Sequence, residues 1–142
     1  MAMSQQELVD TLSGLALFAD LSRPQVEAVA HQMAEESYPT GQRILRQGFT
    51  GTGFYVIVDG EVAIKVDGDE IARLGKGDFF GELSVVDQQP RNASVQAIAD
   101  TRCLSLASWE LLQLLQTDPA LSLNLIRGLV TRIRENGEHH RH

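Results

Sequence analysis

The sequence predicts a mainly β domain, a jelly-roll β-barrel flanked by helices at both ends. Residues 42–107 hold short runs of β-branched and aromatic residues separated by glycine-bearing turns, which is typical of a sandwich or jelly roll. Before and after this stretch, apolar residues recur at helical spacing. A chain of 142 residues fits one domain, so we divide 1–142 into helices at 4–38, the barrel, helices at 108–135 and a loose tail at 136–142.

Two helices are expected before the barrel. Apolar residues near the N-terminus favour a first, short helix. The second has a clearer start, because Ser22 and Gln25 form a capping-box pattern and Pro24 lies in the first turn, where its missing N–H costs nothing. We expect this second helix to end near Glu35–Ser37, ahead of a turn that contains proline and glycine.

The barrel strands are predicted from alternating apolar residues and turn signals. Asp59-Gly60 separates Phe54–Val58 from Glu61–Val66, and an Asp-Gly pair between two such runs predicts a hairpin. Asp67-Gly68 marks a further turn. The later strands expected are Ser94–Ala99 and Arg102–Leu106. Many short strands at close spacing favour a barrel over an α/β sheet.

The chain returns to helix after the barrel. Ser108 is expected to cap a helix over Trp109–Gln116, and Asp118-Pro119 supplies a cap and a first-position proline for another. An apolar stripe runs along that last helix at Leu121, Leu125, Leu129 and Ile133. The stripe is compatible with burial in the core, with a homodimer seam, or with both.

Composition excludes several classes of function. A net charge of −7 argues against sequence-independent binding to nucleic acid, which needs a basic face. No apolar run approaches the ~20 residues of a membrane span, and the first residues lack the layout of a secretory signal. The single cysteine, Cys103, cannot form an internal disulfide. We therefore expect a cytoplasmic protein with no membrane segment and no direct contact to nucleic acid.

Catalysis is not expected either. A metal-dependent enzyme on a small barrel needs histidine and carboxylate ligands on the strands, but none of the four histidines falls within 42–107. The sequence also offers no nucleophile–base pair. We assign no catalytic residue and no metal.

The segment from Gly81 to Ser94 carries the chemistry. A short helical turn opening at Gly81 would present unpaired N–H groups that suit an anion. The Glu82 carboxylate can accept hydrogen bonds from hydroxyls, and nine residues later Arg91 supplies a guanidinium fork that matches phosphate oxygens. Pro90 restricts the backbone just before that arginine. The ligand implied is a small molecule with an anionic end beside a hydroxyl or diol.

This segment resembles the phosphate-binding cassette of cyclic nucleotide-binding domains, as in catabolite activator proteins, protein kinase A regulatory subunits and gated channels. Gly81-Glu82-Leu83-Ser84 and Pro90-Arg91-Asn92-Ala93-Ser94 match its two halves. The N-terminal entry at Leu17–Ser22, the central strands and the two closing helices also occur in the family's order. The resemblance therefore covers nearly the whole chain.

The resemblance implies a role for each matching residue. Glu82 would accept from the ribose 2′-hydroxyl, and Arg91 would pair with the exocyclic phosphate oxygens. Backbone N–H groups near Leu83, Ser84 and Asn92 would complete the phosphate shell. The full set of expected ligand contacts is Phe80, Gly81, Glu82, Leu83, Ser84, Arg91, Asn92 and Ala93. Asn92 departs from the family's Ala, Ser or Thr, so the preference for cyclic AMP over cyclic GMP rests on the family's base rate.

The function expected is that of a regulatory sensor in signal transduction. Ligand capture would shift the helices Trp109–Gln116 and Ala120–Glu135, and this movement would reach an effector domain or protein outside the chain. One alternative is the regulatory fragment of a Crp-like transcription factor, which needs a helix-turn-helix after the last helix. Another is a domain that has lost its ligand and acts in protein interaction. The simplest alternative is that Glu82 and Arg91 form only an internal salt bridge and bind no ligand.

Overall fold

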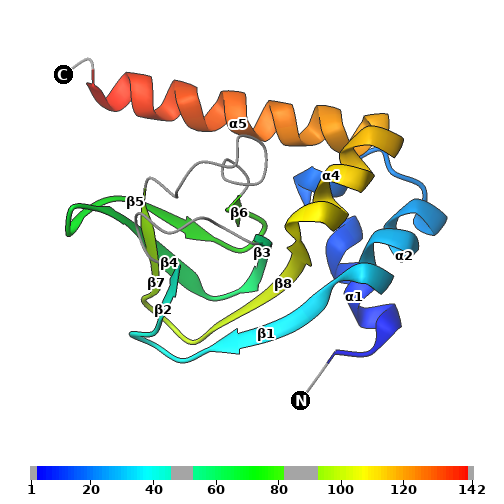
Figure 1. The fold of residues 1–142 in the computed structure, drawn as a ribbon, viewed down its shortest axis with the longest axis horizontal. Coiled ribbons are helices and arrows are strands. Elements are labelled where there is room, and N and C mark those ends of the chain that lie inside the picture. The colour runs from blue at the N-terminus through cyan, green and yellow to red at the C-terminus, as the bar shows by residue number, and fades with distance from the viewer. Residues whose placement is uncertain (1–2, 46–52, 82–92, 141–142) are drawn as a thin grey trace.

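The computed structural model describes residues 3–45, 53–81 and 93–140, with side chains through Arg134. Eight strands form two antiparallel sheets, sheet A in the order β1-β8-β3-β6 and sheet B in the order β2-β7-β4-β5. Helices lie at both ends of the chain, and α5 extends along the side of the barrel (Figure 1). The mainly β jelly roll predicted from the sequence is confirmed, although the strands of the described residues form two separate sheets and not a continuous barrel.

The helices are α1 (Gln5–Ser13), the 3₁₀ turn η1 (Ala16–Phe18), α2 (Arg23–Gln32), α4 (Ser108–Thr117) and α5 (Pro119–His140). The strands are β1 (Ala34–Tyr38), β2 (Arg43–Leu45), β3 (Gly53–Asp59), β4 (Glu61–Val66), β5 (Asp69–Gly75), β6 (Phe79–Phe80), β7 (Ser94–Ala97) and β8 (Thr101–Ala107).

Helix α2 starts as predicted and ends earlier than predicted. The Gln25 N–H donates to Ser22 Oγ at 3.3 Å and the Ser22 N–H donates to Gln25 Oε1 at 2.7 Å, which is a complete capping box. The helix ends at Gln32, however, and β1 begins at Ala34. The expected extension to Glu35–Ser37 was wrong because these residues pair with β8, and pairing across the fold overrides local helix propensity.

The Asp59-Gly60 pair is a corner between the sheets and not a hairpin turn. β3 pairs with β6 and β8, whereas β4 pairs with β5 and β7, so the chain leaves sheet A at this point. Gly60 has φ +101°, and a Cβ there would lie 2.5 Å from Thr101 Oγ1. The hairpin in this region is β4–β5, whose turn at Asp67 and Gly68 has φ values of 53° and 85°.

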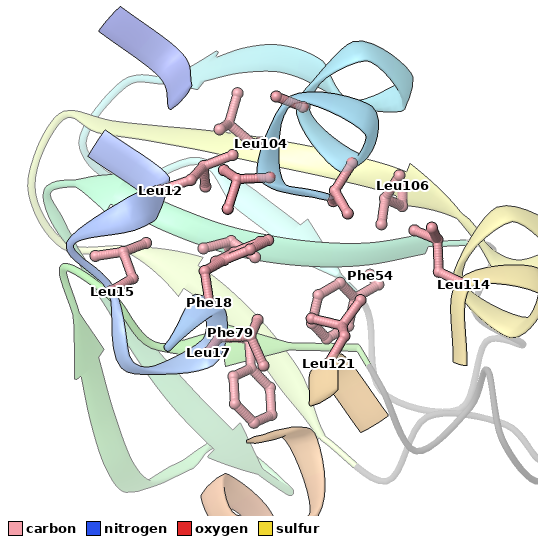
Figure 2. Close-up of a cluster of buried hydrophobic side chains, with 14 of the residues drawn as sticks. Leu12, Leu15, Leu17, Phe18, Phe54, Phe79, Leu104, Leu106, Leu114 and Leu121 are labelled. Carbon is pink, nitrogen blue, oxygen red and sulfur yellow. The ribbon is translucent and has the colours of Figure 1, made fainter. Parts of the chain in front are cut away.

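Sheet A separates two apolar clusters. The helix-side core packs one face of the sheet against α1, η1, α2, α4 and α5, and Figure 2 shows Phe18, Phe54 and Phe79 directed into it. The barrel-interior core lies between sheets A and B and consists of Ile57, Val62, Phe80, Val95 and Cys103. Because successive strand residues point to opposite faces, adjacent residues of β3 and β6 enter different clusters.

The two C-terminal helices differ from the sequence prediction at their ends. Ser108 is the first residue of α4 and not its cap, and the Ala107 N–H donates to Glu110 Oε1 at 2.9 Å. Asp118 does cap α5, because its Oδ1 accepts from the Leu121 N–H at 3.2 Å. The expected loose tail at 136–142 was wrong in part, since α5 continues to His140. No proline interrupts residues 120–140, and the two glycines there, Gly128 and Gly137, cost only about 1 kcal/mol each.

Helix α5 presents two apolar rows. Leu121 and Leu125 are buried in the helix-side core, but Ile133, expected in the same stripe, is 68% exposed. The exposed row is Leu123, Ile126, Val130 and Ile133. Asn124 is buried and its Nδ2 donates to the carbonyl oxygens of Leu17 and Ala19, which ties α5 to η1. Among the described residues, no helix is long and apolar enough to cross a membrane.

Candidate functional site

The predicted ligand segment begins at β6, where two adjacent phenylalanines point in opposite directions. Tyr55 pairs with Phe80 and Val56 pairs with Phe79 across β3 and β6. The Phe79 ring lies in the helix-side core, 5.6 Å from the Phe54 ring. The Phe80 ring lies in the barrel interior, stacked on Tyr55 at 4.9 Å with an interplanar angle of 7°. β6 is therefore fixed from both faces of sheet A.

Gly81 ends β6 with a backbone turn. Its φ of +92° lies in the left-handed region, which glycine adopts without the strain that a side chain would add. The expected ligand residues Glu82, Leu83, Ser84, Arg91 and Asn92 lie outside the described residues, and the chain is described again from Ala93.

The segment ends in β7, which is held between two strands of sheet B. Ser94 pairs with Lys65 of β4, and Ser94 Oγ donates to the Lys65 carbonyl oxygen at 3.3 Å. Lys65 Nζ donates to Gln96 Oε1 at 2.7 Å, and Gln96 Nε2 donates to the Gly41 carbonyl oxygen at 2.9 Å. These bonds fix the backbone directly after Ala93.

The two ends of the segment lie on different sheets. β6 is an edge strand of sheet A and β7 is an inner strand of sheet B. Phe80 and Val95, which flank residues 81–94, both lie in the barrel-interior core. Several partly buried side chains border the interior core. They are Tyr38, Ile44, Leu45, Tyr55, Ile64 and Leu74. A mostly apolar wall with a few polar groups is typical of a small-molecule site.

Two acidic side chains of the barrel interior, Tyr38 and Cys103, stay protonated at neutral pH. Burial and a nearby carboxylate raise the pKa of Tyr38 well above its usual range, and its hydroxyl donates to Glu36 Oε2 at 2.6 Å. Burial also raises the pKa of the Cys103 thiol to about 12. The interior therefore holds a neutral phenol and a neutral thiol, and Cys103 is fully buried.

Helix α5 contacts the start of the segment from the helix side. Arg132 Nη2 donates to the Phe79 carbonyl oxygen at 2.6 Å, and the guanidinium carbon lies 4.6 Å from the centre of the Phe79 ring. Gly128, one turn earlier, lies so close that a Cβ there would be 2.8 Å from two carbons of the same ring. The last helix thus holds the residue just before Phe80 and Gly81.

An open groove of about 1110 Å³ lies elsewhere, between α1 and α2. Its lining includes Arg23, Glu27 and His31 but none of the predicted ligand residues. Arg23 is already paired with Asp10 at 3.0 Å and with Glu27 at 3.5 Å, and both pairs are exposed. Exposed ion pairs of this kind stabilise little and offer no unpaired charge to a ligand, so we assign no site to this groove.

The structure adds two residues that the sequence did not indicate. Of the predicted ligand residues, it describes Phe80, Gly81 and Ala93, at the two ends of the predicted segment. Tyr55 reaches Phe80 from β3, and Arg132 reaches Phe79 from α5, 53 positions along the chain. Neither has a local motif around it. Nothing in the sequence separates Arg132 from the exposed Arg127 and Arg134 on the same helix.

The chain matches known proteins along most of its length. Residues 35–118 match the family described as "Cyclic nucleotide-binding domain". The chain is 33% identical over 129 residues to the cyclic AMP receptor protein of Thermus thermophilus, a match that covers 87% of this chain and 60% of that protein. It is 38% identical over 96 residues to the cAMP-dependent protein kinase type II regulatory subunit of Drosophila melanogaster, covering 65% of this chain and 25% of the subunit.

A solved structure shows the same architecture. The crystal structure of a cyclic nucleotide-binding domain from Methylobacillus flagellatus superposes with a TM-score of 0.81 at 29% identity, covering 95% of this chain and 81% of that one. These matches confirm the family resemblance seen in the sequence. The chain spans only 60% and 25% of the two curated relatives, so their whole-protein activities extend beyond what it matches.

Proposed function

This chain belongs to the family of cyclic nucleotide-binding domains, and from that premise we propose that it captures a cyclic nucleotide and acts as a regulatory module. One observation carries the proposal. β6 and β7 hold the two ends of residues 81–94 on different sheets, and each contributes a side chain to the barrel-interior core, Phe80 from β6 and Val95 from β7. A ligand gripped by that segment contacts the barrel interior and lies next to the residue that α5 holds. The chain's role is binding, with no catalytic step of its own.

In this proposal the ligand is held by charge and hydrogen bonds from a single segment. Arg91 pairs with the cyclic phosphate and Glu82 accepts from the ribose hydroxyl, with backbone N–H groups of Leu83, Ser84 and Asn92 around the phosphate. Phe80, Gly81 and Ala93 frame the segment. A local device of this kind is needed because the chain carries a net charge of −7, which repels an anionic ligand at long range.

Calorimetric titration of ligand-stripped protein tests the proposal. We expect cyclic AMP or cyclic GMP to bind at micromolar Kd or tighter, and 5′-AMP to bind much more weakly. Losing one partner of a buried charge pair costs about 2–5 kcal/mol, so Arg91→Ala should weaken binding at least ~30-fold. Arg73→Ala is the matched control, because this arginine lies on β5 with its side chain 57% exposed and pairs only with surface carboxylates.

Three results of the titration would contradict the proposed role of Arg91 or of the domain. Unchanged affinity in Arg91→Ala, with binding by the wild-type chain, would mean that another group holds the phosphate. Absence of binding by the wild-type chain would favour a domain that keeps the fold and acts through protein interaction. Equal losses in Arg91→Ala and Arg73→Ala would point to the overall charge and not to a specific contact.

We assign cyclic AMP as the preferred ligand. The support is the family's base rate together with the two curated relatives named above, a cyclic AMP receptor and a subunit of a cAMP-dependent kinase. Asn92 carries both a donor and an acceptor and fits neither of the family's usual patterns at this position. Tighter binding of cyclic GMP in the same titration would reverse the assignment.

The output of the module is movement of α4 and α5. α5 lies against the start of the ligand segment through Arg132 and Gly128, and its N-terminal half is tied to η1 through Asn124. A change in the segment therefore reaches the helix that leads out of the domain. The effector that receives this movement lies outside the chain.

The exposed row on α5 favours a homodimer. Leu123, Ile126, Val130 and Ile133 are exposed by 46%, 56%, 39% and 68%. Their spacing of three, four and three residues is that of the a and d positions in a coiled coil. Arg127 and Arg134 then occupy the e positions, which face each other in an antiparallel pair but face Ser122 and Leu129 in a parallel one. Charge repulsion therefore favours the parallel pair.

A parallel pair brings both C-terminal ends together, as suits the alternative of a Crp-like regulator whose DNA-binding part follows α5. Sedimentation equilibrium should show a dimer for the wild-type chain and a monomer for Ile126→Glu. A cysteine introduced by Ile133→Cys should form a disulfide with its own copy, since d positions meet only in the parallel arrangement. A wild-type monomer at every concentration measured would remove the homodimer.

A further inference from the structure

We infer that Arg132 and Gly128 of α5 act as positioning residues for the ligand, because together they hold Phe79 and so place the start of the ligand segment. This inference rests on the proposed function and names the contact through which α5 regulates that site. Strand β6 is only two residues long, which is too short for strand pairing alone to fix its position. Its position therefore depends on what holds Phe79 and Phe80 from either side.

The contact with Phe79 has three parts, and all come from one face of α5. Arg132 donates to the Phe79 carbonyl oxygen at 2.6 Å, a charge-assisted bond of the stronger kind. Its guanidinium also lies over the Phe79 ring at 4.6 Å, within the range of a cation–π interaction. Gly128 lets the helix backbone approach that ring more closely than any residue with a Cβ would allow.

The backbone bond matters more than the ring contact for the ligand. The carbonyl of Phe79 belongs to the peptide unit that leads into Phe80, and Gly81 follows with its left-handed turn. Fixing that peptide fixes the direction in which the chain leaves β6 toward Glu82. Phe79 itself is 5% exposed, so its ring cannot reach a ligand in the barrel interior and can influence binding only through this backbone.

Thermodynamic linkage makes the coupling between α5 and the ligand reciprocal. If a docked α5 favours the bound form of the segment, the bound ligand favours the docked α5 by the same factor. Couplings of this kind amount to about 5–150-fold in affinity. We expect Arg132→Ala to weaken cyclic nucleotide binding about tenfold and to abolish the ligand's protection of α5 amides against hydrogen exchange. Arg132→Lys keeps the charge and a donor but loses the planar fork, so it should restore part of the affinity.

Gly128→Ala gives an independent test, because it should raise the stability of α5 and lower the affinity for the ligand. Alanine favours a helix interior by up to ~1 kcal/mol over glycine, so the change alone strengthens α5. The added Cβ would lie 2.8 Å from the Phe79 ring, so it also pushes the helix away from β6. We expect ligand affinity to fall about fivefold although the helix itself becomes more stable. Phe79→Leu in the same chain should recover affinity, because the smaller side chain makes room for the methyl group.

The experiment is calorimetric titration of cyclic AMP and cyclic GMP into the full chain and these variants, with hydrogen exchange of α5 measured on the same samples. Arg73→Ala is the control, since it removes an exposed arginine that lies on β5 and not on α5. A merely structural role would lower the unfolding midpoint and leave the Kd of the folded protein unchanged. Wild-type binding with unaltered Kd in Arg132→Ala and Gly128→Ala overturns this inference alone. Absence of wild-type binding overturns the proposed function and this inference with it.

Discussion

The two faces of sheet A hold cores of different kinds. Of the described residues, nineteen form the helix-side core, with contributions from every helix, and five form the barrel-interior core. The interior core is bordered by partly buried side chains, among them the hydroxyl-bearing Tyr38 and Tyr55. One face therefore provides most of the burial that stabilises the fold. The other holds a smaller core that includes Phe80 and Val95, next to the two ends of the ligand segment. We therefore expect stability and binding to depend on separate residues.

The largest effect that separates the two cores is expected at Leu104. It is fully buried in the helix-side core at the middle of β8, and truncating a buried leucine costs about 2–5 kcal/mol. Leu104→Ala should therefore lower the free energy of urea unfolding by this amount. Cyclic nucleotide Kd, measured where the variant is fully folded, should stay within about threefold of wild type. A large loss of affinity at unchanged stability would show that the two cores are not independent.

Local signals in the sequence were enough to predict most of the helices that pack on the helix-side core. Ser22 with Gln25 and Asp118 with Pro119 each act within one turn of helix, so their neighbours in sequence are enough to predict them. β1 was missed because its residues become a strand only through pairing with β8, some 70 positions away. Such pairing leaves no trace in the local pattern.

The Asp59-Gly60 corner shows a different limit. The residue pair correctly marked a turn with positive φ at the glycine, but it did not indicate which strands lie on either side of it. In a two-sheet fold the same turn can join paired strands or carry the chain to the other sheet. Only the register of β3 and β4 with their partners distinguishes the two.

The candidate site divides in the same way. Phe80, Gly81 and Ala93 were found because they belong to a short motif with fixed offsets. Tyr55 and Arg132 were not found, because they approach the motif from another strand and from the last helix. Contacts between distant segments depend on how the elements pack. The residues proposed to bind could therefore be predicted from the sequence, whereas the residues that contact Phe79 and Phe80 from other elements could not.

A smaller effect, on pH dependence, tests whether the barrel interior excludes water around Cys103. The pKa of this thiol is raised from 9.0 to about 12, chiefly by burial. A raised pKa gives stability that is complete below pH 9 and is lost as the pH rises toward 12, because only the unfolded chain can then ionise. One unit above the unfolded pKa the loss should be about 1.4 kcal/mol.

Urea unfolding of the wild-type chain and of Cys103→Ala between pH 8 and pH 10 measures this loss. The wild-type stability should fall with pH relative to the variant, which has no thiol to ionise. In the folded wild-type protein at pH 8, alkylation by iodoacetamide should be slow compared with the rate in urea. Parallel pH profiles for the two proteins would mean that water reaches the thiol and that the interior is open at this depth.

The smallest effect concerns two aromatic pairs that lie back to back across β3 and β6. Phe54 and Phe79 are tilted by 33° at 5.6 Å on the helix side, and Tyr55 and Phe80 are stacked at 4.9 Å in the interior. Each pair should give a coupling of about 0.5–1.5 kcal/mol in a double-mutant cycle of unfolding free energy with leucine replacements.

The variants of the two pairs should differ in their affinity for the cyclic nucleotide. Tyr55→Leu releases Phe80 inside the barrel and should raise the cyclic nucleotide Kd, whereas Phe54→Leu leaves both the Arg132 bond to Phe79 and the Tyr55 stack in place and should not. Equal shifts of Kd in the two variants would show that β6 responds as one unit, and that the two faces of sheet A are not separate in function.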